Sequence, residues 1–458
     1  MTSAGDLYWA AREGNLALQE ELKKCANINH VKDSNGWTAL HWAAYKGDVQ
    51  ATQVLISNSA NVDEKNKSGQ TPLHIAAKDG NNNVIKVLLD NSSCISEVDN
   101  DKNTPLHLAL AHSGDLDTVK LLLQNSEDVK SLVNTANKNQ QTPLHIAAQH
   151  GKNSVIKVLL NFPDNSSCVS ELDNDKNTPL HLALAFSGDL DTVKLLLQHS
   201  ENVKSLVDAV NENQETALHL AVNKKSSELV KLLVENFSNS NAFDKNKNTP
   251  FHLEINGKCD FSVIKLMLEH SEDVKSLVNA VNENQQTPLH LTAKKGKNSV
   301  TKLLLEKSSC VRAVDKDMNT PLHLCLAHGG NLDTVKLLLQ HSEDVKHLVN
   351  AANENQETAL HLAVNKDLEI VRLLVENSSF VSAENKDKKR PLDLAIQNQK
   401  RNVAELLTRF DVLQKIGFTI NPDQDPENLN SLVIFDDFSA IEHFLKVSLR
   451  FYDKGPFS

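Results

Sequence analysis

The sequence predicts an all-α protein built as a solenoid of stacked helix pairs, and three observations lead to this fold class. The stretch NTPLHLALA at residues 103–111 returns unchanged at residues 177–185, and looser copies occur along most of the chain. Successive copies are separated by 33 or 38 residues, with one step of 36. Each copy is followed by a second apolar segment such as VIKVLL or TVKLLL. A fixed period of this length indicates a repeat array.

A threonine and, three residues later, a histidine mark ten of these repeats. The threonines are Thr38, Thr71, Thr104, Thr142, Thr178, Thr216, Thr249, Thr287, Thr320 and Thr358. The histidines are His41, His74, His107, His145, His181, His219, His252, His290, His323 and His361. A degenerate copy, RPLDLAIQ, begins at Arg390, and residues 6–30 carry the pattern without the tetrad. We therefore expect about twelve repeats.

The tetrad TPLH has the chemistry of a helix start. The threonine hydroxyl can accept a hydrogen bond from a free NH of the first turn, and proline in the first helical position loses no hydrogen bond. A glycine nine or ten residues later can take the left-handed conformation that ends a helix. These glycines are Gly47, Gly80, Gly114, Gly151, Gly188 and Gly296. Each repeat is thus predicted to be a helix pair, and clusters such as DNDKN form the turn before it.

The longer repeats carry extra residues after the second helix. In QNSEDVKSLVNTANKNQ, at residues 124–140, Val129, Leu132 and Val133 stand at helical spacing. We expect a short additional helical turn that is anchored by these apolar residues. The insert returns three more times, as HSENVKSLV, HSEDVKSLV and HSEDVKHLV.

The repeat unit resembles a known family. SGQTPLHIAAKDGNNNVIKVLLDNS, at residues 68–92, is similar to an ankyrin repeat at most of its signature positions, and the resemblance covers residues 6 to about 407. It implies an ankyrin-repeat α-solenoid whose first helices line a concave face and whose β-turn finger loops project at one edge. The domains expected are an N-terminal capping repeat with the first finger loop (1–37), the solenoid (38–407) and a C-terminal segment (408–458).

The C-terminal segment differs in composition from the repeats. Half of the fourteen phenylalanines lie after residue 407. A polar linker at residues 421–430 precedes FSAIEHFLKVSLRFY, at residues 438–452, whose apolar residues fall on one helical face. We expect a small helical element that either caps the last repeat or binds a partner.

Composition excludes several classes of function. The formal net charge of -11 gives no general surface for nucleic acid, and no apolar run reaches the length of a transmembrane helix. The N-terminus has no signal-peptide pattern. The six cysteines are too scattered for a disulfide framework, since Cys94, Cys168 and Cys310 share one repeat position and Cys25, Cys259 and Cys325 are isolated. We expect a cytoplasmic protein that is a monomer.

The sequence offers no catalytic, cofactor or metal site. Equivalent histidines in neighbouring repeats should stand about 10 Å apart, the diameter of a helix, whereas zinc needs its ligands at about 2 Å. The histidines are therefore expected to form local hydrogen bonds at the helix start. Phosphate-binding loops, nucleophile elbows and paired Cys-x-x-Cys motifs are absent.

The expected binding surface is a basic and partly aromatic row at the ends of the first helices, which could receive an acidic peptide or helix. We call it the first-helix row: Tyr45, Lys46, Lys78, His112, His150, Phe186, Lys224, Lys294, Lys295, His328 and Lys366. Trp37 and Trp42 add a candidate aromatic anchor in the N-terminal repeats.

The function expected from these features is that of a protein-binding scaffold, not an enzyme. The Asn- and Lys-rich composition suggests an effector that an intracellular bacterium delivers into a host cell. Two alternatives stay open: a targeting subunit whose activity lies in or beyond residues 408–458, and a structural spacer.

The repeat at Thr249 is predicted to open first. It has Phe251 in place of leucine, Glu254 in place of alanine, and Gly257 two residues ahead of the usual turn position. A poor interface in a linear array lets neighbouring repeats fray separately. Hydrogen exchange should therefore be faster in residues 249–270 than in residues 142–163, and equal protection of the two segments would refute this.

Overall fold

The computed structural model describes residues 6–13, 18, 21–23, 27–161, 166–236 and 239–415. The chain divides into two compact units, which are residues 1–291 with 307–309, and residues 292–306 with 310–458. Within the described ranges the regular elements are helices joined by turns, and none is a strand. The predicted all-α fold class is therefore confirmed.

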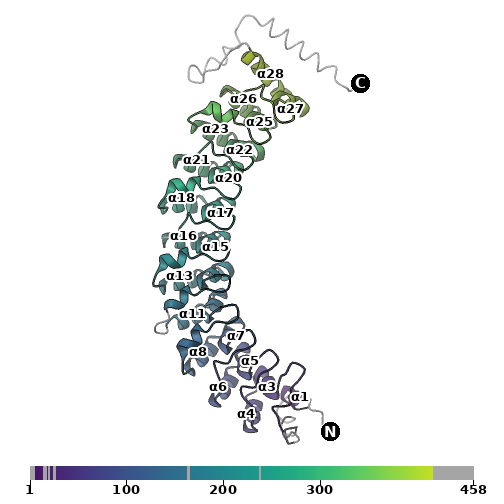
Figure 1. Ribbon diagram of the computed structural model, residues 1–458, viewed down its shortest axis with the longest axis vertical. Coiled ribbons are helices and arrows are strands. Elements are labelled where there is room, and N and C mark those ends of the chain that lie inside the picture. The colour runs from purple at the N-terminus through teal and green to yellow at the C-terminus, as the bar shows by residue number, and fades with distance from the viewer. Residues whose placement is uncertain are drawn as a thin grey trace, which may run out of the picture. The chain divides into compact units, whose positions relative to one another are not determined.

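The first unit contains helix pairs in chain order (Figure 1). Its first helices are α1 (Asp6–Glu13), α3 (Ala39–Lys46), α5 (Pro72–Asp79), α7 (Pro105–Ala111), α10 (Pro143–Gln149), α12 (Pro179–Leu182) with the π-helical turn η2 (Ala183–Ser187), α15 (Ala217–Asn223) and α17 (Pro250–Asn256). Its second helices are α4 (Val49–Ser57), α6 (Asn82–Asp90), α8 (Leu116–Gln124), α11 (Asn153–Leu160), α13 (Leu190–Gln198), α16 (Ser227–Glu235) and α18 (Phe261–Glu269). Short extra elements are α9 (Val129–Asn134), α14 (Val203–Asp208), α19 (Val274–Asn279) and the 3₁₀ turn η1 (Ser166–Ser170).

The division between the units falls within α20 (Pro288–Lys295). The second unit then contains α21 (Asn298–Glu306), α22 (Pro321–His328), α23 (Leu332–Gln340), α24 (Val345–Asn350), α25 (Ala359–Ala363), α26 (Leu368–Glu376), α27 (Pro391–Gln397) and α28 (Arg401–Lys415). Helix α28 crosses residue 408, where the sequence analysis placed a domain boundary. The linker at 421–430 and the helix expected at 438–452 lie outside the described residues, so both stay predictions.

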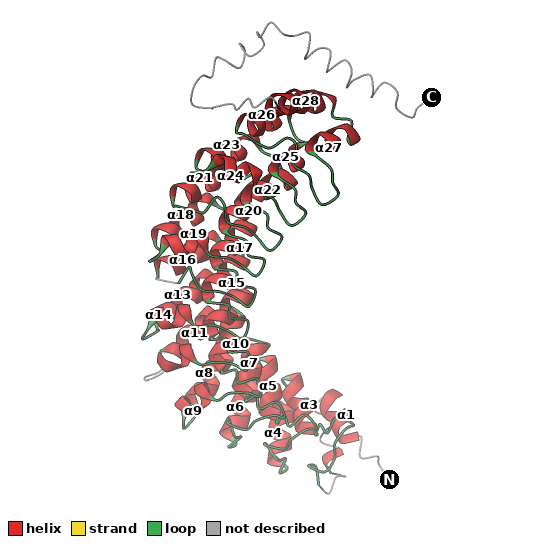
Figure 2. Cartoon of the chain, turned by 45° about the horizontal axis from the view of Figure 1, so that its top comes forward, coloured by secondary structure: helices red, strands yellow, loops and turns green. Residues whose placement is uncertain are grey.

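Within each unit the first helices form one row and the second helices form another, with the finger loops beside the first row (Figure 2). Leucines and alanines of the first helices and valines and leucines of the second helices fill the space between successive pairs. In α5 and α6, for example, Leu73, Ala76, Ile85 and Leu88 are fully buried. One pair alone would leave these faces in water, so each repeat depends on its neighbours.

The threonine and histidine of each tetrad form a reciprocal cap. In α5, the His74 backbone NH donates to Thr71 Oγ1 at 3.4 Å, and the Thr71 backbone NH donates to His74 Nδ1 at 3.2 Å. Because Nδ1 accepts this hydrogen bond, the ring proton of neutral His74 lies on Nε2. The predicted role of these histidines at the helix start is confirmed.

The same histidines also join each repeat to the next one. His74 Nε2 donates to the backbone carbonyl of Asn103, at the base of the following finger loop, at 3.0 Å. Nine such bonds measure 2.9–3.1 Å: His41 to Gln70, His74 to Asn103, His107 to Gln141, His145 to Asn177, His181 to Glu215, His219 to Asn248, His252 to Gln286, His323 to Glu357 and His361 to Lys389.

The finger loops are closed by an Asp or Asn side chain. Asp99 Oδ1 accepts hydrogen bonds from the backbone NH groups of Asp101 and Asn103, at 3.0 and 2.8 Å. Neighbouring fingers are linked by backbone bonds, for example from Asn100 N to Ser68 O at 3.0 Å. Each finger is therefore fixed both internally and to the previous finger.

The turn between the helices of a pair uses a left-handed residue, as the sequence predicted. The six predicted glycines have φ values between 57° and 73°. The repeat at Thr249 differs, since Gly257 has a φ of -87° and Cys259, with a φ of 55°, takes the left-handed position. Buried Glu254 accepts a hydrogen bond from the Asp260 backbone NH at 2.9 Å, and burial raises the pKa of its carboxyl group.

The insert after the second helix of the long repeats is helical, which confirms that prediction. In α9, Leu132 and Val133 are each 2% exposed. The last residue of an insert helix also reaches the following repeat: Asn350 Nδ2 donates to Ser378 O at 2.9 Å, and Phe380 N donates to Asn350 Oδ1 at 2.6 Å. The insert thus strengthens the contact between two repeats at the edge away from the fingers.

Removing one bridging histidine should destabilise the fold in a pH-dependent way. Burial lowers the pKa of His107 to about 4, below its ordinary value of 6.5. The neutral ring therefore stabilises the folded state above pH 6.5, and this contribution is lost as the pH falls through about 4. We expect His107→Ala to lower the unfolding free energy by about 2 kcal/mol at pH 7 and by less near pH 4.5, because buried groups lose their partners.

Urea unfolding followed by circular dichroism at several pH values measures this difference. His347→Ala, which removes an exposed histidine of α24, is the matched control and should leave the unfolding free energy nearly unchanged. A loss for His107→Ala that is the same at both pH values would contradict the proposed neutral bridge.

Candidate protein-interaction surface

The most compact group of predicted binding residues is an aromatic cluster in the first unit. The ring centroids of Trp37 and Trp42 are 4.9 Å apart, and that of Tyr45 lies 5.8 Å from Trp37 and 5.9 Å from Trp42. Trp37 and Trp42 are half-buried, whereas Tyr45 is 47% exposed. The structure therefore brings these three residues together, as a surface that is both apolar and accessible.

Local structure explains how the cluster forms. Trp37 directly precedes the capping residue Thr38, and Trp42 and Tyr45 are three residues apart on α3, so they share one helix face. Asp33 forms hydrogen bonds with both tryptophans of the cluster. Its Oδ1 accepts from the Trp37 backbone NH at 2.9 Å, and its Oδ2 accepts from Trp42 Nε1 at 3.3 Å.

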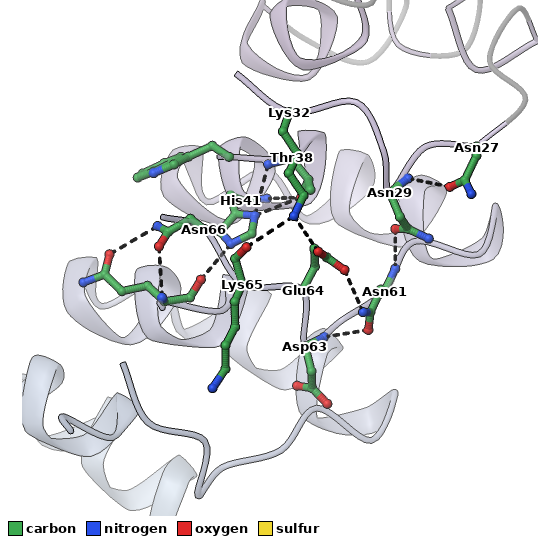
Figure 3. A network of polar contacts seen from close by, with 12 residues as sticks. Asn27, Asn29, Lys32, Thr38, His41, Asn61, Asp63, Glu64, Lys65 and Asn66 are labelled. Carbon is green, nitrogen blue, oxygen red and sulfur yellow. Dashed lines mark hydrogen bonds and ion pairs between the residues drawn. The ribbon is translucent and has the colours of Figure 1, made fainter. Parts of the chain in front are cut away.

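A polar network ties this first finger to the second one (Figure 3). Lys32 Nζ lies 2.6 Å from Glu64 Oε1, and Asn61 Nδ2 donates to Glu64 Oε2 at 2.9 Å. Burial raises the pKa of Glu64, but the hydrogen bonds from Lys32 and Asn61 together lower it below its ordinary value. The first finger, which ends at Trp37, is thus held in place by its contacts with the second finger.

The first-helix row of the first unit is less compact. Lys78 is half-buried, His112 and His150 are exposed, and these three belong to successive repeats. The pKa of His112 is lowered by partial burial and by the positive charge of Lys78, whereas Asp79 opposes this shift. Lys78 and the two histidines therefore lie close enough to influence one another electrostatically.

Further along the row, a lysine has a structural contact. Lys224 Nζ donates to the backbone carbonyl of Phe186 at 2.9 Å, and Phe186 itself is 58% exposed. Lys46 Nζ lies 6.0 Å from the centroid of the Tyr45 ring. These two lysines are therefore partly engaged within the protein, which the sequence pattern did not indicate.

In the second unit the row contains four positions in three successive repeats. Lys295 and His328 are exposed, and Lys294 and Lys366 are half-buried. The aliphatic stem of Lys366 packs over Gly330, where an added Cβ would lie 2.7 Å from Lys366 Cδ. In this unit the row therefore offers one or two positively charged or titratable side chains in each repeat.

Sequence reasoning missed several exposed apolar residues. Trp9 on α1 is 46% exposed, and Leu172, Val210 and Phe243 are 49%, 45% and 47% exposed. The last three each precede the Asp or Asn that closes a finger. Two signals could have found them: all three tryptophans fall within the first 42 residues, and an apolar residue recurs at one finger position.

The described residues show no constellation suited to catalysis or metal binding. No group of three or more His, Cys, Asp or Glu side chains among them could hold a metal ion. Burial raises the pKa of the Cys168 thiol to about 12 and that of Cys325 to about 11, so neither is an activated nucleophile. No described helix is both long enough and apolar enough to cross a lipid bilayer.

Comparison with known proteins identifies the repeats. A family model described as ankyrin repeats (3 copies) matches residues 7–97, 47–133, 125–206, 198–276, 253–348 and 340–416. The transient receptor potential cation channel subfamily A member 1 of Homo sapiens is 26% identical over 170 residues, which are 36% of this chain and 15% of that protein. Inversin of Homo sapiens is 29% identical over 197 residues, which are 43% of this chain and 18% of inversin.

Among solved structures, the crystal structure of the ankyrin repeat domain of Bcl-3 aligns with 51% of this chain and 99% of that chain, at 24% identity and a TM-score of 0.43. The chain thus spans less than a fifth of the length of the two curated relatives.

Proposed function

This chain belongs to the ankyrin repeat family, and from that premise we propose that it is a non-enzymatic scaffold that binds an acidic protein or peptide along the first-helix row. Ankyrin repeats generally mediate protein-protein interaction. The row of Lys294, Lys295, His328 and Lys366 is the observation that supports an acidic partner. These side chains lie at the ends of first helices, on a protein whose formal net charge is -11.

Charge contrast explains why such a row can select a partner. A positive strip within a negative protein repels acidic ligands from most of the surface and attracts them at one place. The proposed ligand is therefore extended and negatively charged, and it contacts one or two cations in each repeat. Neither nucleic acid nor a lipid surface is needed to explain the row, and one copy of the chain suffices.

We also propose that the protein acts in the cytoplasm, and in a host cell if an intracellular bacterium delivers it. Cys94 and Cys325 have free thiols, which supports a reducing compartment. The Asn- and Lys-rich composition supports the bacterial origin. Expression in cultured cells followed by co-purification of bound proteins tests both location and partner.

Reversing the row's charge should weaken binding without weakening the fold. We expect the triple variant Lys294→Glu, Lys295→Glu and Lys366→Glu to bind a labelled peptide of alternating Glu and Ser more slowly and with a flatter salt dependence. Lys295 is exposed and the other two lysines are only half-buried, and charges at such positions contribute little to folding, so the thermal midpoint should fall only slightly. Stopped-flow fluorescence at several salt concentrations measures the association rate.

The matched control reverses three cations on the second helices of the same unit, with Lys302→Glu, Lys336→Glu and Arg372→Glu. It changes net charge equally and should bind the peptide as the unaltered protein does, apart from a small general effect. Equal losses in the two triple variants would show that net charge, and not the row, governs binding.

A further inference from the structure

The aromatic cluster of the first unit has hydrogen-bond donors without partners. Trp37 Nε1 and the Tyr45 hydroxyl make no hydrogen bond within the described part of the chain. Both belong to side chains that are at least partly open to solvent. An indole NH and a phenol at an exposed aromatic surface are suited to bind carbonyl groups of a ligand.

The side-chain acceptors of Asp33 and His41, both of which contact this cluster, already accept hydrogen bonds. Asp33 Oδ1 accepts from the backbone NH groups of Asn35 and Trp37, at 2.8 and 2.9 Å, and its Oδ2 accepts from Trp42 Nε1. His41 Nδ1 accepts from Thr38, and His41 Nε2 donates to Gln70 O. What the cluster offers a ligand is thus ring faces and NH or OH groups, with few acceptors for a ligand's own NH groups.

The rings also stand at steep angles to one another. The interplanar angle of Trp37 and Trp42 is 48°, and Tyr45 is edge-on to both, at 75° and 87°. Rings at these angles present apolar faces and edges in several directions. A ligand with small, rigid, apolar rings on a regular repeat fits such a surface better than one long side chain.

We propose that the surface of Trp37, Trp42 and Tyr45 binds a proline-rich segment in the polyproline II conformation. Prolyl residues have carbonyl groups but no NH, which matches a surface rich in donors and poor in acceptors. Polyproline II segments are pre-ordered, and their pyrrolidine rings pack on exposed aromatic side chains. This inference rests on the proposed function, because it takes the protein to be a protein-binding scaffold. It gives that scaffold a second class of ligand, which binds at a separate surface.

Other ligands fit these contacts less well. A β-strand presents NH groups that would need acceptors, and an α-helix uses its carbonyls internally. A cationic ligand would bind through the ring faces, but the Lys46 ammonium already lies 6.0 Å from the Tyr45 ring centroid and would repel it, and both oxygens of Asp33 already accept hydrogen bonds. The donor pattern therefore favours the proline-rich ligand.

The test measures binding of a labelled polyproline peptide about 12 residues long, which spans about 37 Å in this conformation. The full chain with Trp9→Phe serves as the background, because its remaining tryptophans are Trp37 and Trp42 and its emission then reports on the cluster alone. Fluorescence anisotropy of the peptide gives affinity, and tryptophan emission shows where the peptide binds. An oligoalanine peptide of equal length supplies the same carbonyls with added NH groups and should bind at least about tenfold more weakly.

Two variants separate ring contacts from hydrogen bonds. Tyr45→Ala should reduce affinity for the polyproline peptide about tenfold or more, and Tyr45→Phe, which keeps the ring and loses the hydroxyl, should reduce it by a smaller factor. Phe261→Ala, which removes an exposed aromatic ring of α18, should leave affinity unchanged. Circular dichroism of each variant confirms that the fold is intact.

Failure to bind polyproline, or equal binding by Tyr45→Ala, would overturn the inference. Binding of a lysine-rich peptide in its place would instead mark the cluster as a cation site and would also overturn it. The acidic peptide is tested on the same protein. If only polyproline fails to bind, the proposal for the first-helix row is unaffected. If neither peptide binds, the proposed function is contradicted as well.

Discussion

The structure depends on one hydrogen bond that recurs along the chain, from a buried neutral histidine to the backbone of the next repeat. Within its own repeat the imidazole accepts the NH of the capping threonine through Nδ1, and this leaves Nε2 to donate to the following finger. Burial depresses the pKa of the ring, which keeps it neutral and able to do both. A single residue type therefore starts a helix and joins it to its neighbour.

The structural roles of these repeated residues limit which other residues are available for function. The tetrad, the turn glycines and the residues that close the fingers are buried or bonded to the protein itself, so they cannot also select a partner. The residues that remain available to contact a partner lie at the ends of the first helices and at the exposed finger positions. The positive row near Lys294 and the aromatic group around Trp37 differ in chemistry, and they lie in different compact units. We interpret them as separate surfaces of one scaffold.

The local part of this fold could be predicted from sequence because it depends on short spacings. Threonine and histidine three residues apart indicate the cap, and Val129, Leu132 and Val133 indicate the insert helix. The histidine's second partner could not be predicted in this way, since it lies 28 to 34 residues along the chain. The residue before the threonine also pairs with the residue that closes the same finger: Asn103 donates to Asp99 in one finger, and Asn211 donates to Glu215 in another.

The candidate site was predicted less completely. Sequence placed Trp37, Trp42 and Tyr45 in one region, but the engagement of Asp33, the contact of Lys224 with the Phe186 carbonyl and the exposed Trp9 all depend on side-chain positions. Similarly, the sequence showed Glu254 only as a charged residue at a position where other repeats have alanine. In the structure its carboxylate accepts a hydrogen bond from the Asp260 backbone NH. Contacts of this kind depend on side-chain conformations, which the repeat pattern does not specify.

The most direct test of this account is nitrogen-detected NMR of the histidine rings in the intact chain. The account predicts that the bridging histidines carry their proton on Nε2 at pH 7 and that their pKa lies below the ordinary value of 6.5, near 4 for His41, His107, His181 and His252. Bridging histidines that titrate near 6.5, or that carry the proton on Nδ1, would contradict it, because such rings could not accept from the threonine and donate to the next finger at once.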